Sequence, residues 1–275
     1  MDGNRSCYGS LNEDDCHYRT GLTMTHGTDS STIAKGSVDS YAQSAEFYEV
    51  MALPHWEPKR AVLVSALSDS GDITDPIVDI GSGTGLSTMA IADAVPGVSI
   101  HAVEPSPAMR AVLMSRILSR ADVAARVTVY AETAEQFDLP DRIGAAVLFG
   151  VIGFLDPQAR QYFWENLRPR LTPRAPVLVE VMALEQPMQV PELMIAQQRV
   201  GNRRNEILIS GEAAGADAEL WTMRYVVRED DAVVREFTSN YTWHTVGLTA
   251  LANEAEAHDM TFEQVHPLIG VMRPR

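Results

Sequence analysis

The spacing of apolar residues changes along the chain, and each change predicts a different kind of element. Residues 1–35 are rich in Gly, Ser, Thr, Asn and Asp and show no periodicity, which predicts a disordered leader. From Val38 to Leu67 the apolar positions recur at helical spacing. Pro54 interrupts this pattern, and Pro58 suits the first turn of a second helix. We therefore expect a helical cap over residues 36–70.

The next stretch has the pattern of one βαβ unit. Ile77–Ile80 predict a strand that runs directly into the glycine turn Gly81–Gly85. A helical stretch follows and stops at Pro96-Gly97, after which the apolar run Val98–Val103 ends on Glu104. In such a unit the turn and the acid lie at the same edge of the sheet, where nucleotides bind.

Both features of this edge have a chemical reason. Glycines lack the Cβ that would keep a ligand from the backbone, and they allow the positive φ of a tight turn. The turn leads into a helix N-terminus, whose N–H groups are unpaired. Glu104 can accept hydrogen bonds from the two hydroxyls of a ribose, at roughly 1.5–3 kcal/mol per bond when partly desolvated.

The rest of the chain continues the alternation and then departs from it. A helix is expected after Pro105-Ser106-Pro107, because apolar residues there recur at Met109, Val112, Leu113 and Ile117. Asp156-Pro157 predicts the start of another helix, and a third covers residues 248–255. Further strands of the main sheet are expected at 127–130, 144–149, 177–182, 261–265 and 268–272. Residues 183–204 predict a connector and a helix that starts near Pro191.

In residues 221–243 apolar residues recur with a period of two instead of at helical spacing. Two alternating runs, 221–228 and 233–243, flank a turn at Glu229-Asp230-Asp231 and predict an antiparallel hairpin, with 206–209 as a third strand. This sheet is not part of the minimal doubly wound core.

The glycine turn carries a resemblance to a known family. Asp79-Ile80-Gly81-Ser82-Gly83-Thr84-Gly85 matches the (E/D)-x-G-x-G-x-G motif and resembles the class I S-adenosylmethionine-dependent methyltransferases. The nicotinamide motif G-x-G-x-x-G fits worse, because its third glycine would fall on Leu86. The resemblance implies an α/β fold with a doubly wound, mostly parallel seven-stranded Rossmann-like sheet. It makes residues 71–275 the methyltransferase domain, with an inserted antiparallel sheet at about 183–244 over the acceptor pocket.

The resemblance also implies S-adenosyl-L-methionine as cofactor and a set of residues around it. Tyr41 would reach the methionine end, although it is as well explained as a core aromatic, like Tyr48. Glu132 would contact the adenine unless it is a solvated loop acid, and the backbone after the fourth strand would line the transferred methyl group. The predicted cofactor-binding residues are Tyr41, Asp79, Gly81, Ser82, Gly83, Gly85, Glu104, Pro105, Met109, Glu132, Thr133, Phe149 and Gly150.

Methyl transfer needs alignment above all, which can account for about 7–11 kcal/mol of the barrier. A hydroxyl, a carbon acid or an ammonium acceptor also needs a base. The candidates are His244 at the end of the hairpin, His55 beside Trp56, and Glu180 in the fifth strand. The alternative for each histidine is a cap or a packed side chain, and for Glu180 it is an ion pair with a neighbouring arginine. His101, within a strand, is predicted to be structural.

The hairpin aromatics Trp221, Tyr225, Tyr241 and Trp243 either stack on a flat acceptor or on the sulfonium, or they pack the inserted sheet onto the main domain. No His or Cys spacing typical of a metal site occurs.

Composition narrows the range of molecules that could serve as the acceptor. The formal net charge of −15 argues against nucleic acid as acceptor, so a small molecule of secondary metabolism is favoured. Cys7 and Cys16 are too few for a disulfide framework, and Met24 is an alternative start of translation. No apolar signal core or membrane-length run occurs, so we expect a cytoplasmic protein. The sequence leaves open whether the protein forms a homodimer.

Two other functions remain at this point. A protein could bind S-adenosylmethionine without transferring its methyl group, because the transfer leaves no obligatory catalytic residue. An NAD(P)-dependent oxidoreductase uses the same βαβ unit, but the chain lacks a Tyr-x-x-x-Lys pair. The acceptor atom, oxygen, nitrogen or carbon, is not predicted.

Overall fold

The computed structural model of the protein describes residues 41–275. The predicted leader, including Cys7, Cys16 and Met24, lies outside the described residues. The described chain begins with short helices, as the apolar spacing predicts. They are η1 (Ala45–Phe47), α1 (Tyr48–Ala52), η2 (Leu53–His55) and α2 (Trp56–Ser68). Pro54 falls in η2 and Pro58 in the first turn of α2, where the missing N–H of proline costs nothing.

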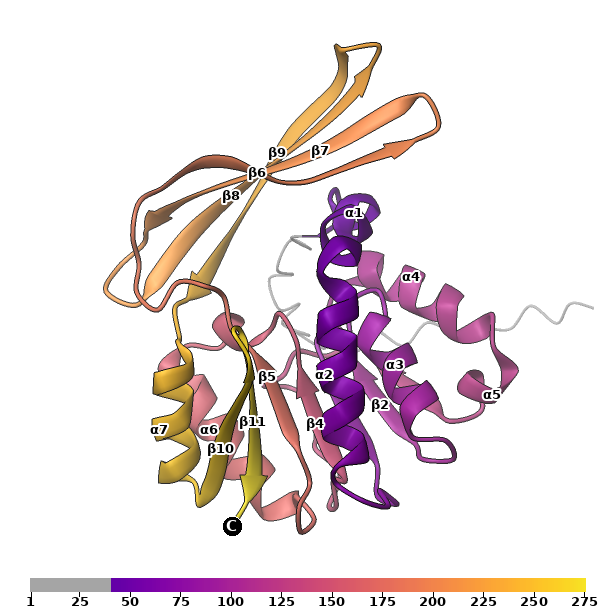
Figure 1. The fold of residues 1–275 in the computed structure, drawn as a ribbon, viewed down its shortest axis with the longest axis vertical. Coiled ribbons are helices and arrows are strands. Elements are labelled where there is room, and N and C mark those ends of the chain that lie inside the picture. Colours follow the sequence, from indigo (N-terminus) through magenta and orange to yellow (C-terminus); the bar gives the residue numbers. More distant parts are fainter. Residues whose placement is uncertain (1–40) are drawn as a thin grey trace, which may run out of the picture. The chain divides into compact units, whose positions relative to one another are not determined.

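A seven-stranded sheet forms the main body (Figure 1), and its strand order is β10-β11-β5-β4-β1-β2-β3. Five neighbouring strands, from β5 to β3, pair in parallel, and β11 pairs antiparallel with both β5 and β10. The mostly parallel seven-stranded sheet is therefore confirmed. Its strands are β1 (Ile77–Ile80), β2 (Ile100–Val103), β3 (Val127–Tyr130), β4 (Ala145–Leu148), β5 (Val177–Glu180), β10 (Met260–His266) and β11 (Ile269–Pro274).

Helices cover both faces of this sheet, because its strands alternate apolar side chains to each side. The helices after the cap are α3 (Leu86–Ala94), α4 (Pro107–Leu118), α5 (Ala121–Ala124), α6 (Pro157–Leu167) and α7 (Leu248–Ala257), with 3-10 turns η3 (Ile152–Phe154) and η4 (Arg168–Arg170). One core joins α2, α3, α4 and α5 to Ile77, Ile100 and Val147. The other joins α6 and α7 to neighbouring positions such as Ala146 and Leu148. The chain is thus doubly wound.

Helix α7 lies beside α6 (Figure 1), and an ion pair and a hydrogen bond join the two helices. Glu254 accepts hydrogen bonds from Arg160 and from the indole N–H of Trp164, at 3.0 and 2.7 Å. Trp164 is fully buried, so its indole N–H needs this partner. None of the helices in residues 41–275 combines the length and apolar character that crossing a bilayer requires.

A second, four-stranded antiparallel sheet is inserted between β5 and α7. Its strands are β6 (Val190–Val200), β7 (Arg203–Ala213), β8 (Ala218–Glu229) and β9 (Ala232–His244), paired in that order. The predicted hairpin is β8–β9, and its turn places Asp230 and Asp231 at positive φ, a conformation that aspartate tolerates.

The predicted helix near Pro191 is wrong, because this segment is the edge strand β6. Glu192, Leu193 and Met194 all favour helices, yet the open edge of β7 offers them a ladder of hydrogen bonds. Pro191 is tolerated at the start of an edge strand, since its missing N–H can face outward. Pairing between distant segments thus overrides local preference here.

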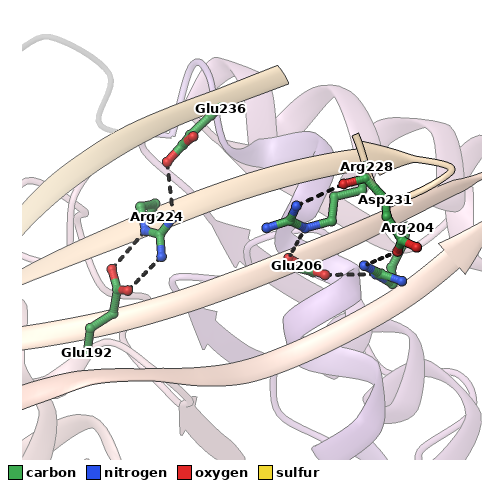
Figure 2. A network of polar contacts seen from close by, with 7 residues as sticks. All are labelled: Glu192, Arg204, Glu206, Arg224, Arg228, Asp231 and Glu236. Atoms are coloured by element: carbon green, nitrogen blue, oxygen red, sulfur yellow. Dashed lines mark hydrogen bonds and ion pairs between the residues drawn. The ribbon is translucent and has the colours of Figure 1, made fainter. Parts of the chain in front are cut away.

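The two faces of the inserted sheet differ in chemistry. Its inner face contributes apolar side chains such as Ile207, Ile209 and Met223 to the core shared with β4, β5 and α6. Its outer face carries a network of ion pairs, which Figure 2 shows. There Arg224 bonds Glu192 and Glu236, while Glu206 accepts from Arg204 and Arg228 at 2.8 and 2.9 Å. The inner face is therefore the one available to a site.

Candidate functional site

The glycine turn between β1 and α3 can be formed only by glycine at its key positions. Gly81, Gly83 and Gly85 have φ values of +65°, +55° and +92°. A Cβ on Gly81 would overlap Cγ2 of Val151, and one on Gly85 would overlap Leu113. The turn therefore brings bare backbone to the carboxyl edge of the sheet.

Asp79 supports this turn through hydrogen bonds between β1 and α3. Its Oδ2 accepts hydrogen bonds from Ser87 Oγ at 2.8 Å and from Thr88 Oγ1 at 2.6 Å, both in α3. Asp79 is 1% exposed, and burial raises its pKa to about 6 despite the two hydroxyl donors; the charge of Glu104 adds to the rise. The structure thus shows Asp79 holding the N-terminus of α3 against β1.

Glu104 lies directly beside the turn. Its Oε2 accepts from the Gly83 N–H at 2.9 Å, and its Oε1 accepts from the Ser106 N–H at 2.8 Å. Its own N–H donates to the carbonyl of Tyr130, at the end of β3. The carboxylate is buried, and each of its oxygens can accept more than one hydrogen bond. The predicted proximity of the acid and the glycine turn is therefore present.

A cavity of about 280 Å³ opens from the glycine turn. Its walls come from four places: the turn, the leading helices, the ends of β4 and β5, and the inner face of the inserted sheet. Apolar side chains of the inserted sheet form one side, namely Ile195, Ile207, Ile209 and Met223. Tyr225, Ser239, Asn240, Tyr241 and Trp243 continue this side.

The leading helices present one continuous stripe to the cavity. Its members are Tyr48, Met51, Ala52, His55, Trp56 and Lys59. Their spacing is that of one helical face, although α1, η2 and α2 are assigned separately. Lys59 and Trp56 were not among the predicted site residues. The helical period of this segment was the signal that could have found them.

Three tyrosines give the cavity hydroxyl groups that stay protonated. Burial raises the pKa of Tyr41 and of Tyr241, and neighbouring phenols add to the effect. Burial also raises the pKa of Tyr48, helped by the negative charges of Glu180 and Glu104. The rings of Tyr41 and Tyr48 meet edge to face at 6.4 Å. These phenols are therefore hydrogen-bond donors at neutral pH.

Two of the three predicted bases line the cavity. Glu180 is at the end of β5 and forms an ion pair with Lys59 of α2, in place of the arginine considered from the sequence. His55 lines the cavity from η2. His244 is not among the lining residues; its Nδ1 lies 3.4 Å from Asp217 Oδ2. The structure thus brings Glu180 and His55 together and leaves His244 apart.

The predicted cofactor residues divide in the same way. Tyr41, Gly81, Ser82, Phe149 and Gly150 line the cavity. The others lie outside that lining, in β1, in the glycine turn, in the segments that follow β2 and β3, and in the first turn of α4. They are Asp79, Gly83, Gly85, Glu104, Pro105, Met109, Glu132 and Thr133. Met109 is a buried core residue, and its N–H donates to the Ser106 cap at 3.2 Å.

Histidine 101 lies away from this cavity, in a cluster of rings. It stacks on Tyr130 at 5.3 Å and meets Phe137 at 6.1 Å. Desolvation lowers the pKa of His101, which favours the neutral ring. This packing agrees with the structural role expected for it.

Trp243 connects the inserted sheet to the loop after β4. Its indole covers Gly153 so closely that a Cβ there would overlap the ring, and Phe154 meets it edge to face at 5.2 Å. Trp243, Tyr241 and Tyr225 line the cavity, whereas Trp221 does not. Three of the four predicted aromatics thus combine packing with a place at the cavity wall.

The residues at this edge fit an adenosyl cofactor. Thr84 Oγ1 is buried at the cavity wall without a hydrogen-bond partner, and a ligand could supply one. Gly150 has open space on the side where a Cβ would lie. The buried carboxylate of Glu104 has the chemistry that binds paired hydroxyls. Within residues 41–275, no His, Cys, Asp and Glu side chains cluster in a way that could hold a metal ion.

Comparison with known proteins gives one family match. Residues 78–177 match a family model described as a methyltransferase domain. This range contains the glycine turn, Glu104 and strands β2 to β4. No curated protein matches the chain at a significant level.

Solved structures share the fold over most of the chain. CalS10, described as an amino pentose methyltransferase from Micromonospora echinaspora, aligns with a TM-score of 0.65 and 17% identity over 80% of this chain and 92% of its own. DesVI of Streptomyces venezuelae gives 0.65 and 15%, over 80% and 92%. KedS8, a sugar N-methyltransferase from Streptoalloteichus sp., gives 0.64 and 16%, over 94% and 99%.

Proposed function

We propose that this chain, whose residues 78–177 are a methyltransferase domain, transfers the methyl group of S-adenosylmethionine to an amine nitrogen of a small hydroxylated molecule such as an amino sugar. One observation carries the proposal. The glycine turn and the carboxylate of Glu180 face the same cavity, whose far side is the inserted sheet. A cofactor-binding edge and an acidic acceptor space are thus contiguous.

The cofactor would be held by groups at the carboxyl edge of the sheet. We assign the ribose to Glu104, the adenine side to Glu132, Thr133, Pro105 and Met109, and the methionine side to Tyr41 and Ser82. The backbone of Gly81, Gly83 and Gly85 makes room for it, with Asp79 bracing the turn. Phe149 and Gly150 border the space beyond it.

An amine acceptor is supported by the charge in the cavity. An amine is protonated in water and must lose a proton before its lone pair can accept a methyl group. Glu180 and His55 are the groups within the cavity lining that can take this proton. We keep His244 as a more remote candidate, because it can reach the cavity only by moving from Asp217.

A hydroxylated acceptor is supported by the polar groups of the wall. Ser239 and the phenol of Tyr241 can exchange hydrogen bonds with sugar hydroxyls. The apolar stretch around Ile207 and Met223 suits the carbon face of a sugar ring. CalS10 is described as an amino pentose methyltransferase and KedS8 as a sugar N-methyltransferase, so both have acceptors of this kind.

The bound cofactor supplies a methyl group that is already electrophilic, because it is attached to a sulfonium. The protein then has to align the amine with that methyl group and exclude water. In the overall transfer a carbon–sulfur bond breaks, a carbon–nitrogen bond forms, and the proton leaves to a base such as Glu180. Alignment of this type accounts for about 7–11 kcal/mol of barrier in favourable cases.

Two measurements test the function. Calorimetric titration with S-adenosylhomocysteine should show binding at micromolar concentration, and none at millimolar concentration would refute the cofactor. Incubation with methyl-labelled S-adenosylmethionine and a panel of amino sugars should yield N-methyl products by mass spectrometry. The matched control is the same panel with hydroxyl in place of amine. Transfer to the hydroxyl compounds alone would refute an amine acceptor.

A further inference from the structure

One ion pair lies inside the cavity wall. Among the described residues that line the cavity, Glu180 is the single carboxylate and Lys59 the single ammonium. They come from β5 and α2, and Lys59 Nζ is paired with Glu180 Oε1. Their side chains are 11% and 25% exposed, so the pair is largely removed from water.

A buried ion pair of this kind contributes little net stability to the fold. Desolvation of two charges offsets most of their attraction, and apolar side chains of similar volume often replace such pairs without loss. The ion pair between Arg224 and Glu192 on the outer face of the inserted sheet differs, because both of its side chains are more exposed. A buried charged pair beside a candidate site is more readily explained by recognition than by folding.

We propose that Glu180 is the binding site for the ammonium group of the acceptor, and that the ammonium of Lys59 occupies this site as an internal competitor. This inference rests on the proposed function and names the group that recognises the substrate. The lysine head is a single charge on a flexible four-carbon stem, so it can leave Glu180 without disturbing α2. Glu180 itself is at the end of a central strand and stays in place.

The surroundings of Glu180 favour a cation. Tyr48 lies near enough for the negative charge of Glu180 to raise its pKa, and its phenol can donate a hydrogen bond to the same region. Met182 and the apolar residues of the inserted sheet exclude water from the cavity. An ammonium that enters such a space gains more from a carboxylate than it would at the surface.

The competitor relationship predicts opposite effects of two substitutions. Glu180→Gln removes the charge that binds the acceptor, whereas Lys59→Met removes only the group that competes with it. If the pair served the fold alone, both substitutions would lower stability, and neither would change the affinity for the acceptor. The matched control is Glu192→Gln, which breaks an ion pair on the outer face of the inserted sheet.

The test is calorimetric titration of the full chain saturated with S-adenosylhomocysteine, using 3-amino-3-deoxyglucose as the probe and glucose as its uncharged counterpart. We expect the amine to bind the wild type more tightly than glucose does. Glu180→Gln should weaken binding of the amine by about tenfold or more. Lys59→Met should tighten it by a few fold, whereas unchanged or weaker binding in Lys59→Met would overturn the competitor role, and Glu192→Gln should have no effect.

Each other outcome has a definite meaning. Equal losses in Glu180→Gln and Lys59→Met would overturn the competitor role, and so would a wild type that binds S-adenosylhomocysteine but shows no preference for the amine. Retained binding of S-adenosylhomocysteine in both variants shows that they are folded. A wild type that fails to bind S-adenosylhomocysteine at all refutes the proposed function instead, and with it this inference.

Discussion

The backbone N–H of Gly83 donates a hydrogen bond to Glu104 Oε2 over 2.9 Å, although the two residues belong to successive loops of the sheet. The same carboxylate accepts from Ser106, the N-cap of α4. Glu104 therefore ties the glycine turn after β1 to the helix that follows β2. A residue predicted to bind a ribose also fixes the shape of the edge where the ribose would lie.

Substitution of Glu104 should separate these two roles. Glu104→Gln keeps the shape of the side chain but has a single acceptor oxygen, so it leaves either the Gly83 or the Ser106 N–H without a partner and should cost about 1–3 kcal/mol of the free energy of unfolding. Cofactor affinity should fall by about tenfold or more, because a charged acceptor is replaced by a neutral one. Glu104→Ala should also lose stability, since it leaves the Gly83 and Ser106 N–H groups without a partner at about 1–3 kcal/mol each.

Urea unfolding and titration with S-adenosylhomocysteine measure the two quantities. Glu135→Gln is the control, because Glu135 is an exposed acid on the loop after β3. Unchanged cofactor affinity in Glu104→Gln would remove Glu104 from the ligand site and leave it as a structural brace.

The glycine turn and the short strands could be predicted from sequence because their signals are local. Residues 78–177 match a methyltransferase domain, in agreement with the motif that begins at Asp79, and solved structures share the predicted fold. The strand Val127–Tyr130 was predicted at its observed bounds. In each case the apolar pattern and the neighbouring turn residues agree, so one reading is favoured.

The errors and omissions concern long-range pairing. The strand β6 was predicted as a helix because its pairing with β7 is invisible in its own composition. The pairing of Glu180 with Lys59 could not be predicted either, since it depends on how α2 lies against β5. His244 looked like a rim residue from its place in the hairpin, yet its ring lies beside Asp217.

Gly81→Ala should disrupt the turn for two separate reasons. The left-handed conformation at φ +65° costs about 1–2 kcal/mol for a residue with a Cβ, and the new methyl group would overlap Val151. We expect a lower melting temperature and loss of S-adenosylhomocysteine binding. The double variant Gly81→Ala, Val151→Ala should recover part of the stability, because only the overlap is relieved. No recovery would indicate that backbone strain alone is responsible.

Asp79 should make stability depend on pH in an unusual direction. Its pKa in the folded protein, about 6, lies above its ordinary value of 3.8, because the carboxyl group is buried. The folded state therefore holds a proton that the unfolded chain releases between these values, so stability from this group is lost as pH rises toward 6. The shift corresponds to roughly 3 kcal/mol. Asp79→Asn should gain stability relative to wild type between pH 4 and pH 7, measured by urea unfolding.

Glu206 should behave in the opposite way. Burial alone would raise its pKa, but the hydrogen bonds from Arg228 and Arg204 outweigh burial and lower it. Its contribution to stability is therefore present above its ordinary pKa of 4.5 and is lost as pH falls below that value. Glu206→Gln should be less stable than wild type at pH 7, and the difference should shrink on acidification. A difference that stays constant with pH would contradict the role of the two arginines.

Gly153→Ala tests whether Trp243 shapes the acceptor end of the cavity. The new methyl group would overlap the indole, which must then move away from the loop after β4. Overpacking of this kind costs about 1–3 kcal/mol, so the melting temperature should fall. Because Trp243 lines the cavity on the side of the inserted sheet, the KM for the amine acceptor should rise by about tenfold. Binding of S-adenosylhomocysteine should change by no more than about twofold.

Gly270→Ala is the matched control for this experiment. It creates an overlap of the same kind, with the ring of Phe262 in the β10–β11 hairpin, and neither residue lines the cavity. It should lower the melting temperature to a similar extent and leave the acceptor KM unchanged. If both glycine variants altered KM equally, the loss would reflect general destabilisation. If only Gly153→Ala altered KM, the contact between Trp243 and Gly153 would be a determinant of acceptor binding that acts through the shape of the wall.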